Sequence, residues 1–589
     1  MLVKHPARSG LAMLLCALLG LAVWASAAVA SAGASSTAPQ TRYAKVRRVC
    51  RAPGPGRAGC LALKLKAARA GSPGALPYVV AAGARSKGPA GGLTPADIAS
   101  AYSFSPTATG GGQTVAIVDA YDDPKIEKDL ASFDGNYGLP ACTTENGCFE
   151  KVGQTGSSSS LPTPDTTGWS IEISLDVEMV HSVCESCRIL LVEANSEDNA
   201  DLAAAVNEAV ALGADEVSNS YGSPESEEEG STYAPDYDHP GVVVTASSGD
   251  EGYFDWDDVE ELEPAPGQPD GPASYPTVVS VGGTSLKLSG KGLRKSETVW
   301  NDSGPPSANG SFKHLKQFSA GGGGCSTLFT APSWQQQAAG WAATGCGTHR
   351  LSADVSAVAD PYTGFDIYSS YRYEQFAETG WMTIGGTSVS SPLISAMFAL
   401  AGGSHGVSYP AETLYQHLGD SGDLFDVTQG GNGYCDGEPD AQCGEPAAND
   451  ELGDVDCLET TACDAAPGYD GPSGVGAPIG LVALGGPAPE VPPTVLTEKA
   501  TEVSGGDAVL NATVDPNGSE VTSCAFEYGP GTTIDQSVAC SPSPGSGDEA
   551  VAVTAHLTGL TRGSVYRFRI NAGNGGGTST GKTKKLRAR

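Results

Sequence analysis

The chain has 589 residues, which is too long for one ordinary domain, so we expect two or three. Its 68 Asp and Glu residues outnumber its 34 Lys and Arg residues, which gives a formal charge of −34 at pH 7. This charge argues against nucleic acid as a partner, and it is compatible with work at low pH, where protonation of carboxylates reduces self-repulsion.

Residues 1–32 have the pattern of a secretory signal peptide. Lys4 and Arg8 form the charged start, Leu11–Val29 is the apolar stretch, and the small residues of Ala28-Val-Ala30 offer a cleavage site. No later segment has eighteen apolar residues, so we predict a secreted, extracellular protein with no membrane span after processing.

The cysteine count agrees with export. Removing Cys16 with the signal peptide leaves 14 of the 15 cysteines, an even number. Close spacing predicts five disulfides, namely Cys50–Cys60, Cys142–Cys148, Cys184–Cys187, Cys325–Cys346 and Cys524–Cys540. The pairing among the remaining four stays open: Cys435, Cys443, Cys457 and Cys463. A redox or zinc role for the CxxC pair at 184–187 is disfavoured, because no second CxxC motif accompanies it.

Residues 33–92 form a basic block before an acidic body. They contain eleven Lys or Arg residues and no Asp or Glu. Two interpretations stay open, a short pro-segment that is held partly by charge and removed near Leu93, and a disordered linker.

From Leu93 onward, strand-like and helix-like segments alternate. Leu93–Tyr102 has the pattern of a short capped helix. Apolar runs typical of buried strands lie at 114–119, 189–193, 241–246 and 277–281, and helix-like segments lie at 125–133 and 200–212. This alternation predicts an α/β fold with a doubly wound, mostly parallel sheet.

Glu172 and Asp176 are four residues apart, so they share one face of a predicted helix. A solvated acidic face is the ordinary interpretation, but this helix is apolar nearly all round and should be buried. Two buried carboxylates side by side tend to share a proton, which favours a functional role. His181 follows Glu172 by nine residues, about half a turn off in helical phase, so we predict a packed or capping histidine.

Asp250 lies just past the carboxyl end of an apolar strand, where catalytic groups of open α/β sheets gather. An ordinary turn residue is the alternative. At Thr383–Pro392 a glycine pair leads into a serine cluster, and Pro392 with Ser391 as N-cap predicts a helix start. Ser388 then lies at a glycine-led turn where free N–H groups favour a nucleophilic serine and its oxyanion, the alternative being a serine-rich cap without chemistry.

Assembled, these motifs resemble the sedolisin family of serine-carboxyl peptidases, which are acid-active endopeptidases with a subtilisin-like fold. The resemblance covers roughly residues 93–485. Its motifs are Glu172-x-x-x-Asp176, Ser218-Asn-Ser-Tyr-Gly222, Ser248-Gly-Asp250, Gly321–Trp334, Arg350–Pro361, and Gly385-Gly-Thr-Ser388 with Pro392. It implies four catalytic residues: Ser388 as nucleophile, Glu172 as general base, Asp176 as its partner and Asp250 as the oxyanion-hole acid. One departure is Tyr221, which stands where many members carry Trp.

The resemblance also implies one structural calcium ion. Two carboxylates and three backbone carbonyls would form a cage of hard oxygen ligands suited to Ca²⁺. The implied residues are Asp426, Val427, Ala466, Gly468 and Asp470.

The C-terminal part of the chain is predicted to form a separate domain. Residues 486–493 form a proline-rich linker, and residues 494–589 alternate with period two between turn residues, as in a small all-β sandwich. The pattern looks like a fibronectin type III domain, for which a surface or polymer ligand is one candidate partner.

The leading hypothesis is a secreted, calcium-bound serine-carboxyl endopeptidase that cleaves proteins or peptides at acid pH. A glutamate base and a protonated Asp250 both favour low pH. A subtilisin-type triad of Asp119, His181 and Ser388 is a weaker alternative. The alternative from another class is a catalytically inactive secreted binding protein that uses its fibronectin-like module.

Overall fold

The computed structural model describes residues 40–51, 53–69, 76–80, 88–107, 112–253, 267, 269–302, 319–372, 379–433, 460–485, 492–547 and 549–589. The predicted signal peptide, most of the proline-rich linker, and Cys435, Cys443 and Cys457 lie outside these residues. Among the helices that the structure describes, none is long and apolar enough to cross a membrane.

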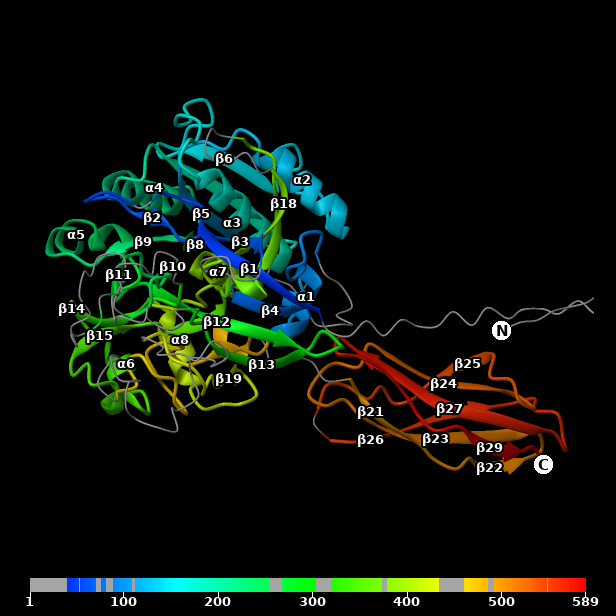
Figure 1. Cartoon of the computed structure of the whole chain (residues 1–589). Coiled ribbons are helices and arrows are strands. Elements are labelled where there is room, and N and C mark those ends of the chain that lie inside the picture. The colour runs from blue at the N-terminus through cyan, green and yellow to red at the C-terminus, as the bar shows by residue number, and fades with distance from the viewer. Residues whose placement is uncertain are drawn as a thin grey trace, which may run out of the picture.

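An eight-stranded sheet forms the centre of the larger unit (Figure 1). Its order is β13-β12-β10-β8-β5-β7-β6, with β16 also pairing with β12. Every pairing is parallel except β12 with β13, which confirms the predicted mostly parallel sheet. The strands are β5 (Thr114–Ala120), β6 (Phe149–Gly153), β7 (Arg188–Ala194), β8 (Glu216–Asn219), β10 (Val243–Ser247), β12 (Val279–Leu288), β13 (Arg294–Val299) and β16 (Val355–Val358).

Helices cover both faces of this sheet. Alternate residues of β5 point to two separate hydrophobic cores: Val115 and Ile117 to one, Ala116 and Val118 to the other. The first core includes apolar residues of α2 (Ile126–Tyr137), α3 (Trp169–Val183) and α7 (Thr387–Ala401), and the second includes those of α4 (Asn199–Ala211). Because strand side chains alternate between faces, this division is the doubly wound arrangement.

Helix α3 is buried over its whole length, as predicted from its apolar sequence. A helix that is apolar all round belongs inside a large protein. The two acids of this helix, Glu172 and Asp176, are therefore fully buried, like the other residues of α3.

The start of helix α7 differs from the prediction. The helix begins at Thr387 with Gly386 as N-cap, so Pro392 lies inside it and Ser391 is not the cap. Proline has no N–H to donate to the carbonyl four residues back, which is that of Ser388. The hydroxyl of Ser220 donates to this carbonyl instead, at 3.5 Å, so the helix tolerates the proline.

The basic N-terminal block also forms strands, namely β1 (Gln40–Arg48), β2 (Gly59–Cys60), β3 (Leu63–Ala68) and β4 (Leu76–Val80). Three of them join β17 (Phe365–Ser369) and β18 (Gly380–Gly385) in a second sheet of order β17-β18-β3-β1-β4. β2 pairs instead with β9 (Tyr221–Pro224). The block is therefore integrated with the body of the protein.

Shorter elements complete the larger unit. They are α1 (Pro95–Ala101), α5 (Glu227–Thr232), β11 (Asp270–Gly271), β14 (Gly324–Thr330), α6 (Ser333–Gln336), β15 (His349–Ser352), α8 (Ala411–Gln416), β19 (Leu424–Phe425) and β20 (Ala477–Pro478). All five predicted disulfides are present.

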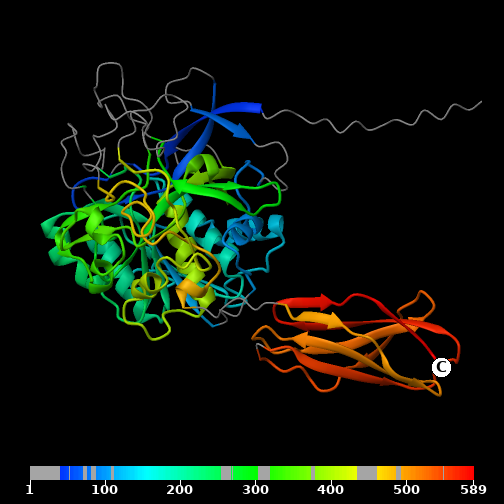
Figure 2. The ribbon, with the colours of Figure 1, turned by 90° about the horizontal axis from the view of Figure 1, so that it is seen from below.

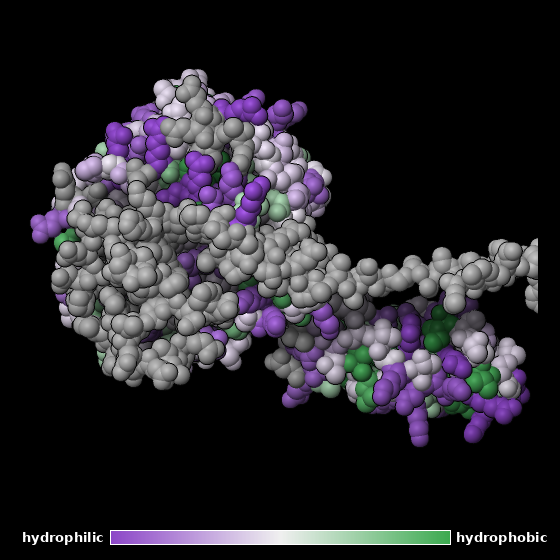
Figure 3. All heavy atoms as spheres, in the orientation of Figure 1, coloured by the Kyte–Doolittle hydropathy of each residue, from purple (hydrophilic) through white to green (hydrophobic). Residues whose placement is uncertain are grey.

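The C-terminal residues form a sandwich of two antiparallel sheets, drawn in orange and red in Figure 2. One sheet contains β21 (Thr494–Thr497), β22 (Thr501–Ser504), β23 (Asp507–Asp515) and β26 (Val551–Leu557). The other contains β24 (Ser523–Pro530), β25 (Gln536–Ala539), β27 (Val565–Asn574), β28 (Gly577–Thr580) and β29 (Lys584–Arg587). Inward-facing residues of both sheets share one core, as the period-two pattern predicted. The face of this C-terminal sandwich that is visible in Figure 3 is mostly hydrophilic, with scattered hydrophobic residues.

Candidate active site

Ser388 lies in the first turn of α7 and is fully buried. Its hydroxyl donates to the backbone carbonyl of Ser220, which follows β8, at 3.3 Å. The glycine at the N-cap, Gly386, has φ of 100°, a conformation that favours glycine. The turn predicted before Ser388 is thus present, although it enters the helix earlier than expected.

Glu172 faces this serine from α3, which packs against α7. Burial raises the pKa of Glu172 well above its usual range, the charge of Asp176 raises it further, and hydrogen bonding with the hydroxyl of Ser388 lowers it. Within the described residues, neither oxygen of Glu172 has a partner in strict hydrogen-bond geometry. The carboxyl therefore has a free oxygen in reach of the Ser388 proton.

Asp176 lies one turn further along α3 and is also fully buried. Burial raises the pKa of Asp176, and hydrogen bonding with the hydroxyl of Ser220 lowers it. Two carboxyls in one dry site cannot both stay charged, so the pair binds a proton at acid pH.

Asp250 approaches Ser388 from the end of β10. Its Oδ1 accepts from the backbone N–H of Thr387 at 2.7 Å and from the Thr387 hydroxyl at 2.9 Å. Its Oδ2 is buried and has no partner among the described residues. Burial raises the pKa of Asp250 to about 7. Below that pH the carboxyl is neutral, and its proton belongs on the free oxygen, because the other one accepts two hydrogen bonds.

Asp119 is a fourth acid of this cluster, which the sequence placed beside Ser388 only in the weaker triad alternative with His181. It lies near the carboxyl end of β5 and is fully buried. Burial raises the pKa of Asp119 most, followed by the charges of Asp176 and Glu172. The available signal was the position of Asp119 at the carboxyl end of an apolar strand, close to the signal that pointed to Asp250.

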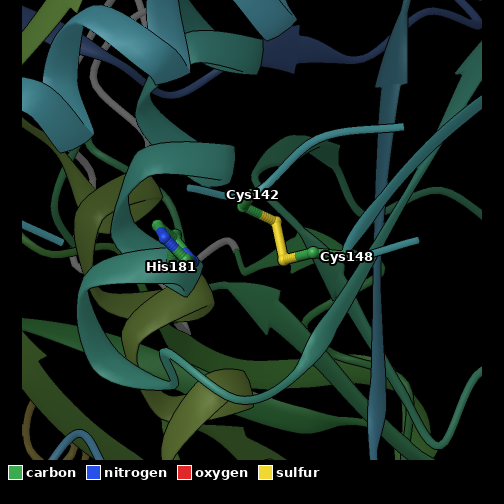
Figure 4. A group of neighbouring side chains, drawn as sticks. All are labelled: Cys142, Cys148 and His181. Carbon is green, nitrogen blue, oxygen red and sulfur yellow. A yellow bond between two sulfur atoms is a disulfide. The ribbon is translucent and has the colours of Figure 1, made fainter. Parts of the chain in front are cut away.

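His181 lies away from this cluster. Nine helical residues correspond to about 13 Å along the axis from Glu172. Its Nε2 pairs with the backbone carbonyl of Pro140 at 2.8 Å, and burial lowers its pKa, so the ring is a neutral packed histidine, as predicted. Figure 4 shows it beside Cys142 and Cys148. These three residues resemble a metal site only by proximity, since both sulfurs are in a disulfide.

The residues implied for calcium come together in one loop cluster. Asp470 is buried, accepts from the backbone N–H groups of Ala466 and Ser473 at 2.9 Å, and accepts from the Ser473 hydroxyl at 2.7 Å. The N–H of Gly468 points to both oxygens of Asp426 at 3.2 Å. Burial raises the pKa of Asp470 to about 8, and the charge of Asp426 adds to this rise. Asp470 is buried and Asp426 is exposed, and two neighbouring acids that repel one another at such a place fit a hard divalent cation.

Comparison with known proteins shows what the chain is similar to. The family model described as the subtilase family matches residues 159–425. Kumamolisin from Bacillus sp. strain MN-32 is 31% identical over 410 residues, which cover 66% of this chain and 62% of kumamolisin. Sedolisin from Pseudomonas sp. strain 101 is 28% identical over 368 residues, covering 59% of this chain and 57% of sedolisin. The chain thus spans about three fifths of the length of these two relatives.

A solved structure of Pseudomonas sedolisin, a serine-carboxyl proteinase complexed with pseudo-iodotyrostatin, aligns with a TM-score of 0.52 and 26% identity. The alignment covers 67% of this chain and 98% of that one. The larger unit therefore has a subtilisin-like α/β fold. In sequence and fold the chain is similar to the sedolisin-type serine peptidases, the class that the sequence motifs indicated.

Proposed function

We propose that this chain is a serine-carboxyl endopeptidase that hydrolyses peptide bonds of proteins or peptides at acid pH. The observation that carries the proposal is the convergence of Glu172 and Asp250 on the first turn of α7, where Ser388 lies. Oδ2 of Asp250 is buried without a hydrogen-bond partner in the described residues, and the buried carboxyl of Glu172 interacts with the hydroxyl of Ser388. Such unpaired groups are costly unless a substrate or a reaction step uses them.

The proposed reaction begins when the Ser388 oxygen attacks the carbonyl carbon and its proton passes to Glu172. Asp250, protonated below about pH 7, donates through Oδ2 to the developing oxyanion. Glu172 then returns the proton to the leaving nitrogen, and water hydrolyses the ester on Ser388. Asp176 acts through Glu172 by holding the second proton of the pair.

Replacing Ser388 tests this proposal most simply. We expect Ser388→Ala to lower hydrolysis of a denatured protein at pH 4 on the order of 10⁴-fold or more. Ser390→Ala is the matched control, because its hydroxyl is also buried in α7 but donates within the helix to the carbonyl of Thr387. Unchanged hydrolysis in Ser388→Ala, or none in the parent, would favour the inactive binding protein instead.

We further propose that Asp426 and Asp470, with the carbonyls of Val427, Ala466 and Gly468, hold one structural Ca²⁺. The ion would neutralise the two acids and tie the loop before β20 to the loop after β19. No reaction step depends on it.

Secretion, and a fibronectin-like role of residues 494–589 in binding a surface or polymer, are also proposals. The five disulfides support an oxidising compartment. The strand-only sandwich supports a spacing or binding module, and deleting it should reduce retention on an insoluble substrate without reducing hydrolysis of a soluble one.

A further inference from the structure

The C-terminal sandwich keeps its positive charges apart from most of its negative ones. Residues 494–589 contain nine Lys or Arg and nine Asp or Glu residues, so the whole formal charge of −34 belongs to residues 1–493. Within the sandwich, residues 562–589 contain eight of the nine cations and no acid. These residues form β27, β28 and β29 and the turns beside them. Part of a neutral unit is therefore strongly basic.

β27 and β29, which lie side by side in the sandwich (Figure 1), place three of these cations on one outer face. Tyr566 of β27 pairs with Leu586 of β29, and both side chains are buried in the sandwich core. Because strand side chains alternate between faces, the next pair, Arg567 with Lys585, points outward. Arg587 lies two residues along β29 from Lys585 and shares this face. Lys585 and Arg587 are exposed, and Arg567 is half-buried.

These three cations are not neutralised by acids of the sandwich. Residues directly opposite one another in an antiparallel pair have Cβ atoms about 5 Å apart, and like charges there are destabilising. On the same face, Arg569 forms an ion pair with Glu527 at 2.7 Å. Arg567, Lys585 and Arg587 form no ion pair with any residue that the structure describes. The repulsion between Arg567 and Lys585 is therefore left for an anionic ligand to offset.

Protection of a sheet edge does not account for this arrangement. Among the described strands β29 pairs only with β27, and lysine on such an edge strand often serves to prevent pairing with another chain. Arg567, however, lies on β27, which also pairs with β24 on its other side. The Nε of Arg567 donates to the carbonyl of Gly531 at 3.2 Å, which orients the guanidinium group. Asp535 lies over Gly529, the residue opposite Arg567, without forming an ion pair with it.

We propose that the face formed by Arg567, Lys585 and Arg587 binds a linear sulfated polysaccharide. This inference rests on the proposed binding role of residues 494–589 and not on the peptidase chemistry. Lys585 and Arg587 are about 7 Å apart along their strand, so they meet successive anionic groups of an extended chain.

The chemistry of this face favours sulfate on a sugar polymer. Sulfate esters stay ionised at the acid pH of the proposed activity, whereas carboxyl groups with an ordinary pKa of about 4 are partly protonated there. The residues of β24, β27 and β29 that share this face include no aromatic side chain, so they offer no surface on which the bases of a nucleic acid stack. The acidic residues before the sandwich repel nucleic acid as well.

The experiment measures the Kd of the full chain for dextran sulfate at pH 4.5 and low salt, in a Ser388→Ala background that prevents self-digestion. We expect Lys585→Gln combined with Arg587→Gln to raise this Kd by about tenfold or more, because two charge contacts are lost, and added salt should weaken the parent more steeply than the variant. Lys499→Gln is the control, since Lys499 is equally exposed but lies between β21 and β22 of the other sheet. It should change the Kd by less than about twofold. Uncharged dextran should not bind.

The outcomes separate this face from the broader binding role. An unchanged Kd in the double variant, or an equal loss in Lys499→Gln, would show that the face is wrong. Tighter binding of single-stranded DNA than of dextran sulfate would assign the face to nucleic acid, and loss of self-association without loss of dextran sulfate binding would assign it to a second copy of the chain. If deleting residues 494–589 leaves retention on an insoluble substrate unchanged, the proposed binding role itself fails.

Discussion

At the scale of single residues, Gly386 decides whether a carbonyl oxygen can approach Asp250. We expect Gly386→Ala to lower kcat/KM by at least about 100-fold, the effect of removing an oxyanion contact, because its Cβ would fill the place of that oxygen. Gly380→Ala is the matched control, since Gly380 has a similar φ of 102° but nothing within 4 Å of an added Cβ. Equal losses in both variants would point to backbone strain and contradict the role of the space beside Gly386.

At the scale of elements, the loop cluster around Asp470 should depend on calcium. At pH 7, chelation should lower the Tm of the parent by about 3 °C, the effect on a unit of this size of losing an ion at about 100 times its Kd. The decrease should be smaller at pH 4.5, where the pKa of about 8 keeps Asp470 protonated without an ion. Asp470→Asn should lose the response and the exposed-loop variant Asp420→Asn should keep it. A parent Tm that ignores chelation would contradict the calcium proposal.

The elements also show how far the sequence predicts this molecule. The burial of α3 followed from its apolar residues, and the disulfides followed from cysteine spacing. The start of α7 could not be predicted from local sequence. Proline normally marks the first turn of a helix, but Pro392 lies inside α7, where the hydroxyl of Ser220, remote in sequence, donates to the carbonyl of Ser388 that the proline leaves without its helical partner. The pairing of Cys60 with Tyr221 is likewise long-range, so no local pattern predicts that the basic block pairs with the body of the protein.

At the scale of the whole molecule, many buried acids make stability depend on pH. Burial raises the pKa of Asp123, Asp134 and Asp250 to about 7 and that of Glu193 to about 9. The folded state then binds more protons than the unfolded state between about pH 4 and these values, so stability falls as pH rises. A single rise in pKa from 3.8 to about 7, as at Asp250, corresponds to a change of about 4 kcal/mol in the free energy of unfolding between low and high pH.

We therefore expect Ser388→Ala, used because it cannot digest itself, to unfold at a higher temperature at pH 4.5 than at pH 7.5. Calorimetry with saturating calcium at both pH values isolates the buried acids from the ion. A higher Tm at pH 7.5 would mean that the acids are paired or hydrated in the folded protein.

The central claim is that carboxyl groups, without histidine, activate Ser388 and stabilise the oxyanion. The pH dependence of kcat/KM for the parent and for Asp250→Asn tests it most directly. The parent should be most active on the acid side and should lose activity as pH rises through about 7, where Asp250 loses its proton. Asp250→Asn should be about 100-fold slower at pH 4.5 and should lack that loss near pH 7, because an amide donates without a titrating proton. A neutral or alkaline optimum in the parent, or the same loss near pH 7 in both proteins, would contradict the account.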